Sequence, residues 1–278
     1  MPANINKQNS RRWDGMLQRT ATGAALVAVS IGVVLGASYP IVLKIVTLVL
    51  SVAGTYELVR AAHLVQERGF LYGCMATAGI VSLLPIPRYP DLLPWITAAA
   101  VLVFSFIMQR NSRCILDTKP RTGGICLLTV LLLRSIPEYA FSEHGSCYLG
   151  FALLVCYATD AFAYLGGKAF GSHKLCPKIS PNKTVEGSIC GILGAVIINL
   201  TLGLLWDVNT PLLLGYTICA SVVGQFGDLA VSGVKRAFAV KDLGNILPGH
   251  GGILDRFDSH MFAVPFTLLF FRFTNGLF

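Results

Sequence analysis

Acidic side chains are scarce in this chain, and one of them stands in the middle of an apolar stretch. Asp228 follows Gly-Gln-Phe-Gly and precedes Leu-Ala-Val-Ser-Gly-Val. An ionisable residue in such a stretch is costly and by default marks a functional site. On a helix, Gly224, Asp228, Ser232 and Lys235 share one stripe. This spacing predicts a site for a metal and a phosphate. The alternative is an internal Asp–Lys pair that joins two helices.

The segment that follows, residues 235–259, combines cations, glycines and acids. Its cations suit phosphate oxygens, and its glycines permit close approach of the backbone to a ligand. Its acids suit Mg²⁺, which typically takes one or two carboxylates together with substrate phosphates. We expect two of these acids to share a face at the start of the last helix. The candidates are Lys235, Arg236, Lys241, Gly251, Gly252, Asp255, Arg256 and Asp258. His250 is a further candidate, as an acid, a base or a hydrogen-bond donor, or else as a residue that only shapes the turn.

A second polar cluster covers residues 174–187. Ser180 followed by Pro181 predicts the capped start of a helix. The free N–H groups of that helix start, with Asn182 and Lys183, form a plausible phosphate seat. The alternative is a capped helix with solvated lysines. Asp160 could bind a metal or pair with a lysine, or it could serve helix packing. Glu186 is a further candidate of second rank, for the metal or for supporting contacts.

The rest of the chain must hold these residues, and its composition indicates a lipid environment. Of the 278 residues, 54% are hydrophobic and 13% are charged, against about 25% charged residues in soluble domains. The mean hydropathy is +0.65. This excludes an ordinary soluble enzyme, a disordered chain and a collagen-like repeat. The eight cysteines form no CxxC pair and indicate apolar packing.

We therefore predict an all-α, polytopic membrane protein with about nine transmembrane helices in a single domain, residues 1–278. A span needs about 20 mostly apolar residues. The expected spans are 20–38, 41–59, 70–87, 92–109, 122–137, 146–166, 187–206, 208–232 and 259–274. Residues 20–150 form the N-terminal helices, and residues 151–278 carry the helices and loops with the candidate chemistry. The first span could alternatively be a signal peptide.

The basic residues orient the expected spans. All of the 22 Lys and Arg residues except Lys44, Arg88, Arg134 and Arg272 fall on one side of a nine-span chain. Positive charge accumulates in cytoplasmic loops, so we expect the N-terminus and the long loops in the cytoplasm, and any chemistry at that face of a bacterial cytoplasmic membrane. The net charge of +8 fits this topology better than it fits nucleic-acid binding.

The polar segments resemble a known enzyme family. Ser232-x-Val-Lys-Arg-x₄-Lys-Asp-x-Gly-x₂-Leu-Pro-x-His-Gly-Gly-Ile-x-Asp-Arg-Phe-Asp258 is similar to the signature of phosphatidate cytidylyltransferases, also called CDP-diacylglycerol synthases. The segments around Asp160, from Ser180 to Gly187 and at Asp228 resemble the same family. The resemblance covers residues 157–260. Residues 1–150 are similar only as a run of apolar helices.

The resemblance implies transfer of a cytidylyl group from CTP to phosphatidic acid, giving CDP-diacylglycerol and pyrophosphate with Mg²⁺. It implies Asp228 and Asp255 as the metal-holding pair, with Asp258 as a further metal candidate. The phosphate ligands would be Lys183, Lys235, Arg236, Lys241 and Arg256. It leaves open a second, monovalent metal and a homodimer. The alternatives are a CTP-dependent polyprenol or phytol kinase and a transporter. A transporter would line a path across the bilayer with polar residues, whereas the ionisable residues of this chain crowd one face.

Overall fold

The computed structural model describes residues 20–84, 118–206, 208–247, 251–274 and 276–277. These residues are mostly helical, as predicted. The helices are Thr20–Leu35, α2 (Pro40–Ala61), α3 (Arg68–Leu83), α5 (Thr118–Leu133), the 3₁₀-helix η1 (Ile136–Phe141), α6 (Gly145–Phe170), α7 (Val185–Gly203), α8 (Thr210–Ala237) and α9 (His260–Phe273). The strands β1 (Lys174–Cys176) and β2 (Ser180–Thr184) pair as an antiparallel hairpin.

Five of the described segments are long and apolar enough to cross a membrane. They are Pro40–Ala61, Thr118–Phe141, Gly145–Phe170, Val185–Gly203 and Thr210–Ala237. The helices Thr20–Leu35 and His260–Phe273 are apolar but shorter. The predicted span 92–109 lies outside the described residues, so the count of nine spans stays a prediction.

The surfaces of these helices confirm a multi-pass membrane protein. On α7, Ile189, Leu193 and Ile197 follow one another at intervals of one turn and are all exposed. Ile41 and Ile45 form the same kind of row on α2. Rows of exposed aliphatic side chains are unfavourable in water and suit acyl chains, because a soluble helix carries polar residues on its outer face.

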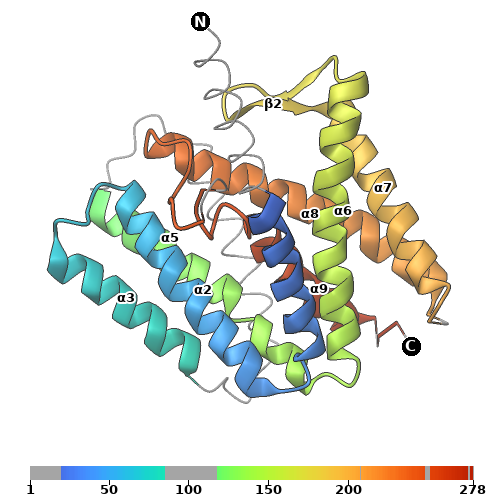
Figure 1. Cartoon of the computed structure of the whole chain (residues 1–278), viewed down its shortest axis with the longest axis horizontal. Helices are drawn as coiled ribbons and strands as arrows, with labels where there is room; N and C mark the ends of the chain where they lie inside the picture. The colour runs from blue at the N-terminus through green and yellow to red at the C-terminus, as the bar shows by residue number, and fades with distance from the viewer. Residues whose placement is uncertain (1–19, 85–117, 207, 248–250, 275, 278) are drawn as a thin grey trace, which may run out of the picture.

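The helices α6 and α7 pack closely and carry the hairpin at one end (Figure 1). A Cβ atom on Gly191 would lie 2.8 Å from the carbonyl oxygen of Thr159 on α6. A Cβ on Gly187 would lie 2.7 Å from the carbonyl oxygen of Ala163. These small residues therefore let the two backbones touch. Gly32 and Gly36 have the same four-residue spacing as Gly187 and Gly191. A Cβ on Gly32 would meet nothing within 4 Å, so among the described residues Gly32 does not bring two helices together.

Two local predictions are wrong. Ser180 does not cap a helix, because residues 180–184 form strand β2, whose pairing with β1 engages the backbone there. The helix α7 begins five residues later, and its cap is Thr184, whose Oγ1 accepts a hydrogen bond from the N–H of Gly187 at 3.1 Å. Asp255 and Asp258 do not share a helix face either, since α9 begins only at His260 and both lie in the preceding turns. The hairpin also corrects the prediction of a purely helical fold.

Candidate functional site

Most of the candidate acids meet in one cavity of about 530 Å³. Its walls come from α6, from β2 and the start of α7, from α8 and from the turns before α9. The lining residues with ionisable side chains are Asp160, Tyr164, Lys168, Lys183, Asp228, Asp255, Arg256 and Asp258. Segments that lie up to about 100 residues apart in the chain thus bring acids and cations together, and Asn182 joins them in the wall.

Asp228 and Lys183 form an ion pair across this cavity. Lys183 lies on β2 and Asp228 on α8, and the lysine Nζ donates to Asp228 Oδ2. The hydroxyl of Ser232, one turn further along α8, donates to Oδ1 at 3.3 Å. The helix α8 continues without a break through Lys235, so the predicted stripe from Asp228 to Lys235 is confirmed.

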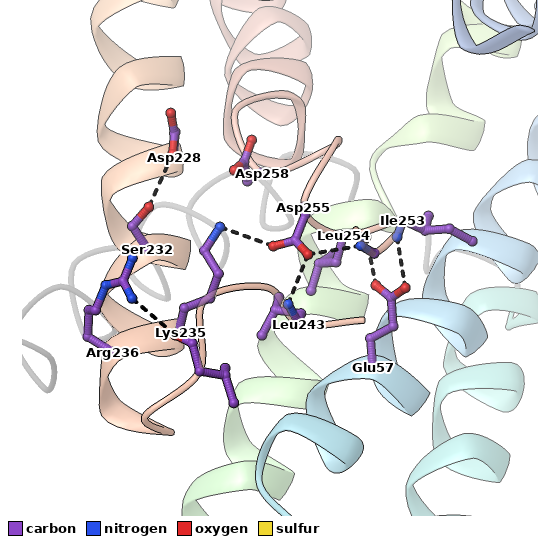
Figure 2. A network of polar contacts seen from close by, with 12 residues as sticks. Glu57, Asp228, Ser232, Lys235, Arg236, Leu243, Ile253, Leu254, Asp255 and Asp258 are labelled. Atoms are coloured by element: carbon purple, nitrogen blue, oxygen red, sulfur yellow. Dashed lines mark hydrogen bonds and ion pairs between the residues drawn. The ribbon is translucent and has the colours of Figure 1, made fainter. Parts of the chain in front are cut away.

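Asp255 is held on both of its carboxylate oxygens (Figure 2). Its Oδ1 accepts from Lys235 Nζ at 3.0 Å, and its Oδ2 accepts from the N–H groups of Leu243 at 2.9 Å and Gly252 at 3.0 Å. The side chains of Lys235 and Asp255 are only 11% and 3% exposed. Asp255 therefore fastens the turn that carries it and also closes one wall of the cavity.

Asp258 faces the cavity beside other carboxylates. Burial raises the pKa of Asp258, and the neighbouring charges of Asp228 and Asp160 raise this pKa further, against the opposing effect of Lys235. Carboxylates that repel one another in a half-buried cavity are relieved by a cation. Within the described part of the chain, no three Asp, Glu, His or Cys side chains form a metal cage on their own. The arrangement instead suits Mg²⁺, which completes its shell with substrate phosphates and water.

The other predicted site residues lie around the cavity rather than in its wall. Arg236 is exposed at the end of α8, where its Nε donates to the carbonyl of Ile179 at 3.2 Å and so ties α8 to the hairpin. Lys235 is not in the wall itself but contacts Asp255, which is. The remaining predicted residues outside the wall are Ser180, Lys241, Gly251, Gly252 and Glu186. The Glu186 carboxylate accepts from the backbone N–H groups of Ser172 and His173, and His250 falls outside the described residues.

Sequence reasoning missed three residues of this region. Ser188 on α7 and Gln225 on α8 line the cavity and are hydrogen-bonded to each other. Their polar side chains sit in apolar helices, but nothing in their spacing indicates that they meet. The third is Glu57 on α2, whose carboxylate accepts from the backbone before Asp255. The sequence could have indicated Glu57, because it is the only acid in the long apolar run of α2.

Comparisons with known proteins identify the family of the chain. A model described as the cytidylyltransferase family matches residues 17–274 of the chain. A protein of Staphylococcus aureus (strain COL) named phosphatidate cytidylyltransferase is 39% identical over 206 residues, which cover 69% of this chain and 76% of that protein. A protein of the same name from Staphylococcus saprophyticus is 42% identical over 174 residues, covering 61% and 65%. The match extends well beyond residues 157–260, on which the sequence resemblance rested.

Proposed function

The chain belongs to the cytidylyltransferase family and is an enzyme of the phosphatidate cytidylyltransferase type, and from this premise we propose the reaction that its cavity serves. The enzyme transfers a cytidylyl group from CTP to phosphatidic acid and produces CDP-diacylglycerol and pyrophosphate. The observation that carries this proposal is the cavity itself, where acids and cations from α6, β2, α8 and the turns before α9 meet. Two polyanionic substrates need such a mixture of groups.

In this reaction an oxygen of the lipid phosphate attacks the α-phosphorus of CTP. The new P–O bond forms as the bond to the β-phosphate oxygen breaks, and pyrophosphate leaves with the bonding electrons. The lipid phosphate is already an anion at neutral pH, so no strong general base is required. The enzyme's part is to bring the two anions together and to stabilise the charge that develops.

Lys183, which forms an ion pair with Asp228, and Arg256, which follows Asp255 in the chain, both line the cavity. We assign them to substrate phosphates, and Lys183 would exchange its contact with Asp228 for a phosphate oxygen. Arg236 and Lys241 are exposed and lie outside the cavity wall, and we assign them to attracting the anionic substrates. Asn182 lies in the cavity wall and would support the phosphates there, and Gly251, Gly252 and His250 keep the supporting roles that the sequence predicts.

Asp228, Asp255 and Asp258 would hold Mg²⁺. When bound, this ion neutralises charge on the triphosphate. The fit rests on the gathering of these carboxylates in one cavity, where burial, and after it the neighbouring charges of Asp228 and Asp160, raise the pKa of Asp258. Asp255 Oδ1 accepts a hydrogen bond from Lys235, so this lysine would fix the carboxylate that helps to hold the ion.

We place the reaction at the cytoplasmic face of the membrane, with the N-terminus on the same side, because the lysines and arginines concentrate in the segments that include the hairpin. A cysteine introduced at the exposed Lys178 tests this in a variant without the native cysteines. A membrane-impermeant maleimide should label it in inside-out vesicles and not in right-side-out ones, and the reverse pattern would overturn the assignment.

The reaction is tested with purified enzyme, phosphatidic acid and CTP that carries ³²P at either the α- or the γ-position. Label from the α-position should enter the lipid product only with Mg²⁺, and label from the γ-position should remain in water as pyrophosphate. Label from the γ-position in the lipid would instead identify a CTP-dependent kinase. Binding of CTP without any turnover would favour a transporter.

A further inference from the structure

Three consecutive backbone N–H groups just before Asp255 donate to carboxylates. Gly252 donates to Asp255 itself at 3.0 Å. Ile253 donates to Glu57 Oε1 at 2.8 Å, and Leu254 donates to Glu57 Oε2 at 2.9 Å. Figure 2 shows Glu57 reaching from α2 to these two groups. Each oxygen of the Glu57 carboxylate therefore holds one N–H group, although 196 or more residues separate the partners in the chain.

The loop fits closely around this carboxylate. Glu57 is fully buried, with 0% of its surface exposed. A Cβ atom on Gly244 would lie 2.5 Å from Oε1, and one on Gly252 would lie 2.6 Å from Oε2. Neither glycine has a positive φ, so the backbone conformation does not require glycine at these positions. The space that Glu57 occupies requires it, and two separate parts of the loop press against the same side chain.

The contact leads directly to the cavity, although Glu57 is not among the residues that line it. Leu254 is adjacent to Asp255, and its side chain packs on α2, where a Cβ on Gly54 would lie 3.3 Å from Leu254 Cδ1. Fixing the backbone at residues 253–254 fixes the direction from which the Asp255 carboxylate meets Lys235. The same turn continues to Asp258.

We propose that Glu57 is a positioning residue of the active site. It holds the turn at residues 252–255 from the N-terminal half of the chain, so that Asp255 and Asp258 face the cavity. The proposal rests on the proposed function, because that function gives these two aspartates their role. It adds a residue of α2, outside the signature segment, to the machinery of the reaction.

The variant Glu57→Gln tests this with almost no change of volume. Its amide offers one acceptor oxygen and turns an NH₂ group against the second backbone N–H, which leaves a buried donor without a partner. Hydrogen exchange of the peptide from Gly251 to Asp258 should become faster by about tenfold or more at Ile253 and Leu254. Because the aspartates lose their fixed position, the Mg²⁺ concentration for half-maximal activity should rise by about threefold or more, and kcat should fall by about tenfold.

The matched control is Glu67→Gln. Glu67 also lies in the N-terminal half, but it forms an ion pair with Lys119 at the surface, where the two side chains are 44% and 53% exposed. The Glu67→Gln variant should leave both the hydrogen exchange at Ile253 and Leu254 and the Mg²⁺ dependence of the activity unchanged. Wild-type exchange rates and wild-type Mg²⁺ dependence in Glu57→Gln would overturn the proposal. So would a lower yield of folded protein whose kinetics per folded molecule stay normal, since that result indicates a merely structural role.

A second variant keeps the test decisive if the Glu57 variants fold poorly. Gly244→Ala pushes a methyl group against the Glu57 carboxylate. It should reproduce the faster exchange and the higher Mg²⁺ concentration for half-maximal activity. In a Glu57→Ala background the same alanine should have little further effect, because the clashing atoms are gone. Normal exchange and kinetics in Gly244→Ala would contradict the proposal. So would a double variant in which the effects of Gly244→Ala and Glu57→Ala simply multiply. An inactive wild-type enzyme would refute the proposed function instead, and the exchange data would still show whether Glu57 holds the loop.

Discussion

Replacing Lys235 by methionine tests how the site depends on its most buried ion pair. The Lys235 Nζ lies 3.0 Å from Asp255 Oδ1, and both side chains are almost entirely buried. Removing one partner of a buried pair costs about 3–5 kcal/mol, because the other charge remains without compensation. Asp255 keeps two backbone donors, from Leu243 and Gly252. We therefore expect the lower end of this range, a loss of about 3 kcal/mol in the free energy of unfolding.

The assay is the initial rate of CDP-diacylglycerol formation from CTP and phosphatidic acid in detergent micelles, with the melting temperature of each variant measured beside it. Lys235→Met should lower the melting temperature by about 6–12 °C and should also lower kcat/KM, because Asp255 loses a contact that fixes its carboxylate. Lys235→Arg, which keeps the charge, should retain more activity. The control is Lys178→Met, an exposed lysine of the hairpin, which should stay within about twofold of the wild type. A Lys235→Met enzyme with unchanged kcat/KM and melting temperature would refute this reasoning.

Three further predictions concern the same cavity and the helices that build it. Asp228→Asn should abolish Mg²⁺-dependent release of pyrophosphate while the protein still inserts into membranes, and near-normal release would remove Asp228 from the metal site. Lys183→Ala should raise the KM for CTP or for phosphatidic acid by about tenfold, as loss of a charged hydrogen bond does, and unchanged kinetics would exclude it from the site. Gly191→Ala places a methyl group 2.8 Å from the Thr159 carbonyl and should lower the free energy of unfolding by about 1–3 kcal/mol, as followed by thermal melting. Gly215→Ala, where an added Cβ meets nothing within 4 Å, is its control, and equal melting of the two variants would contradict the packing argument.

The sequence predicted the features that depend on neighbouring residues. Long apolar runs identify helices because a span needs a fixed length of apolar chain, and α2, α6, α7 and α8 appear where they were expected. The stripe from Asp228 to Lys235 follows from the helical period alone. The family signature placed the acids of the cavity in one site, although the chain separates them.

The features that the sequence did not predict depend on partners far away in the chain. The hairpin forms because Lys174–Cys176 pairs with Ser180–Thr184, and strands this short have no periodicity of their own to read. Asp255 and Asp258 lie in turns rather than on α9 because carboxylates accept the N–H groups there. Glu57 lies almost 200 residues before its partners, so only its isolation in an apolar helix could have drawn attention to it.

The most direct test of the central claim is to locate the divalent cation. Crystals of the enzyme grown with CTP and Mn²⁺, which replaces Mg²⁺ and scatters anomalously, would show where the ion binds. The account predicts an anomalous peak in the cavity, bound by Asp228 and by Asp255 or Asp258 and in contact with the nucleotide phosphates. A peak at any other position, or bound nucleotide with no ion at these carboxylates, would contradict it.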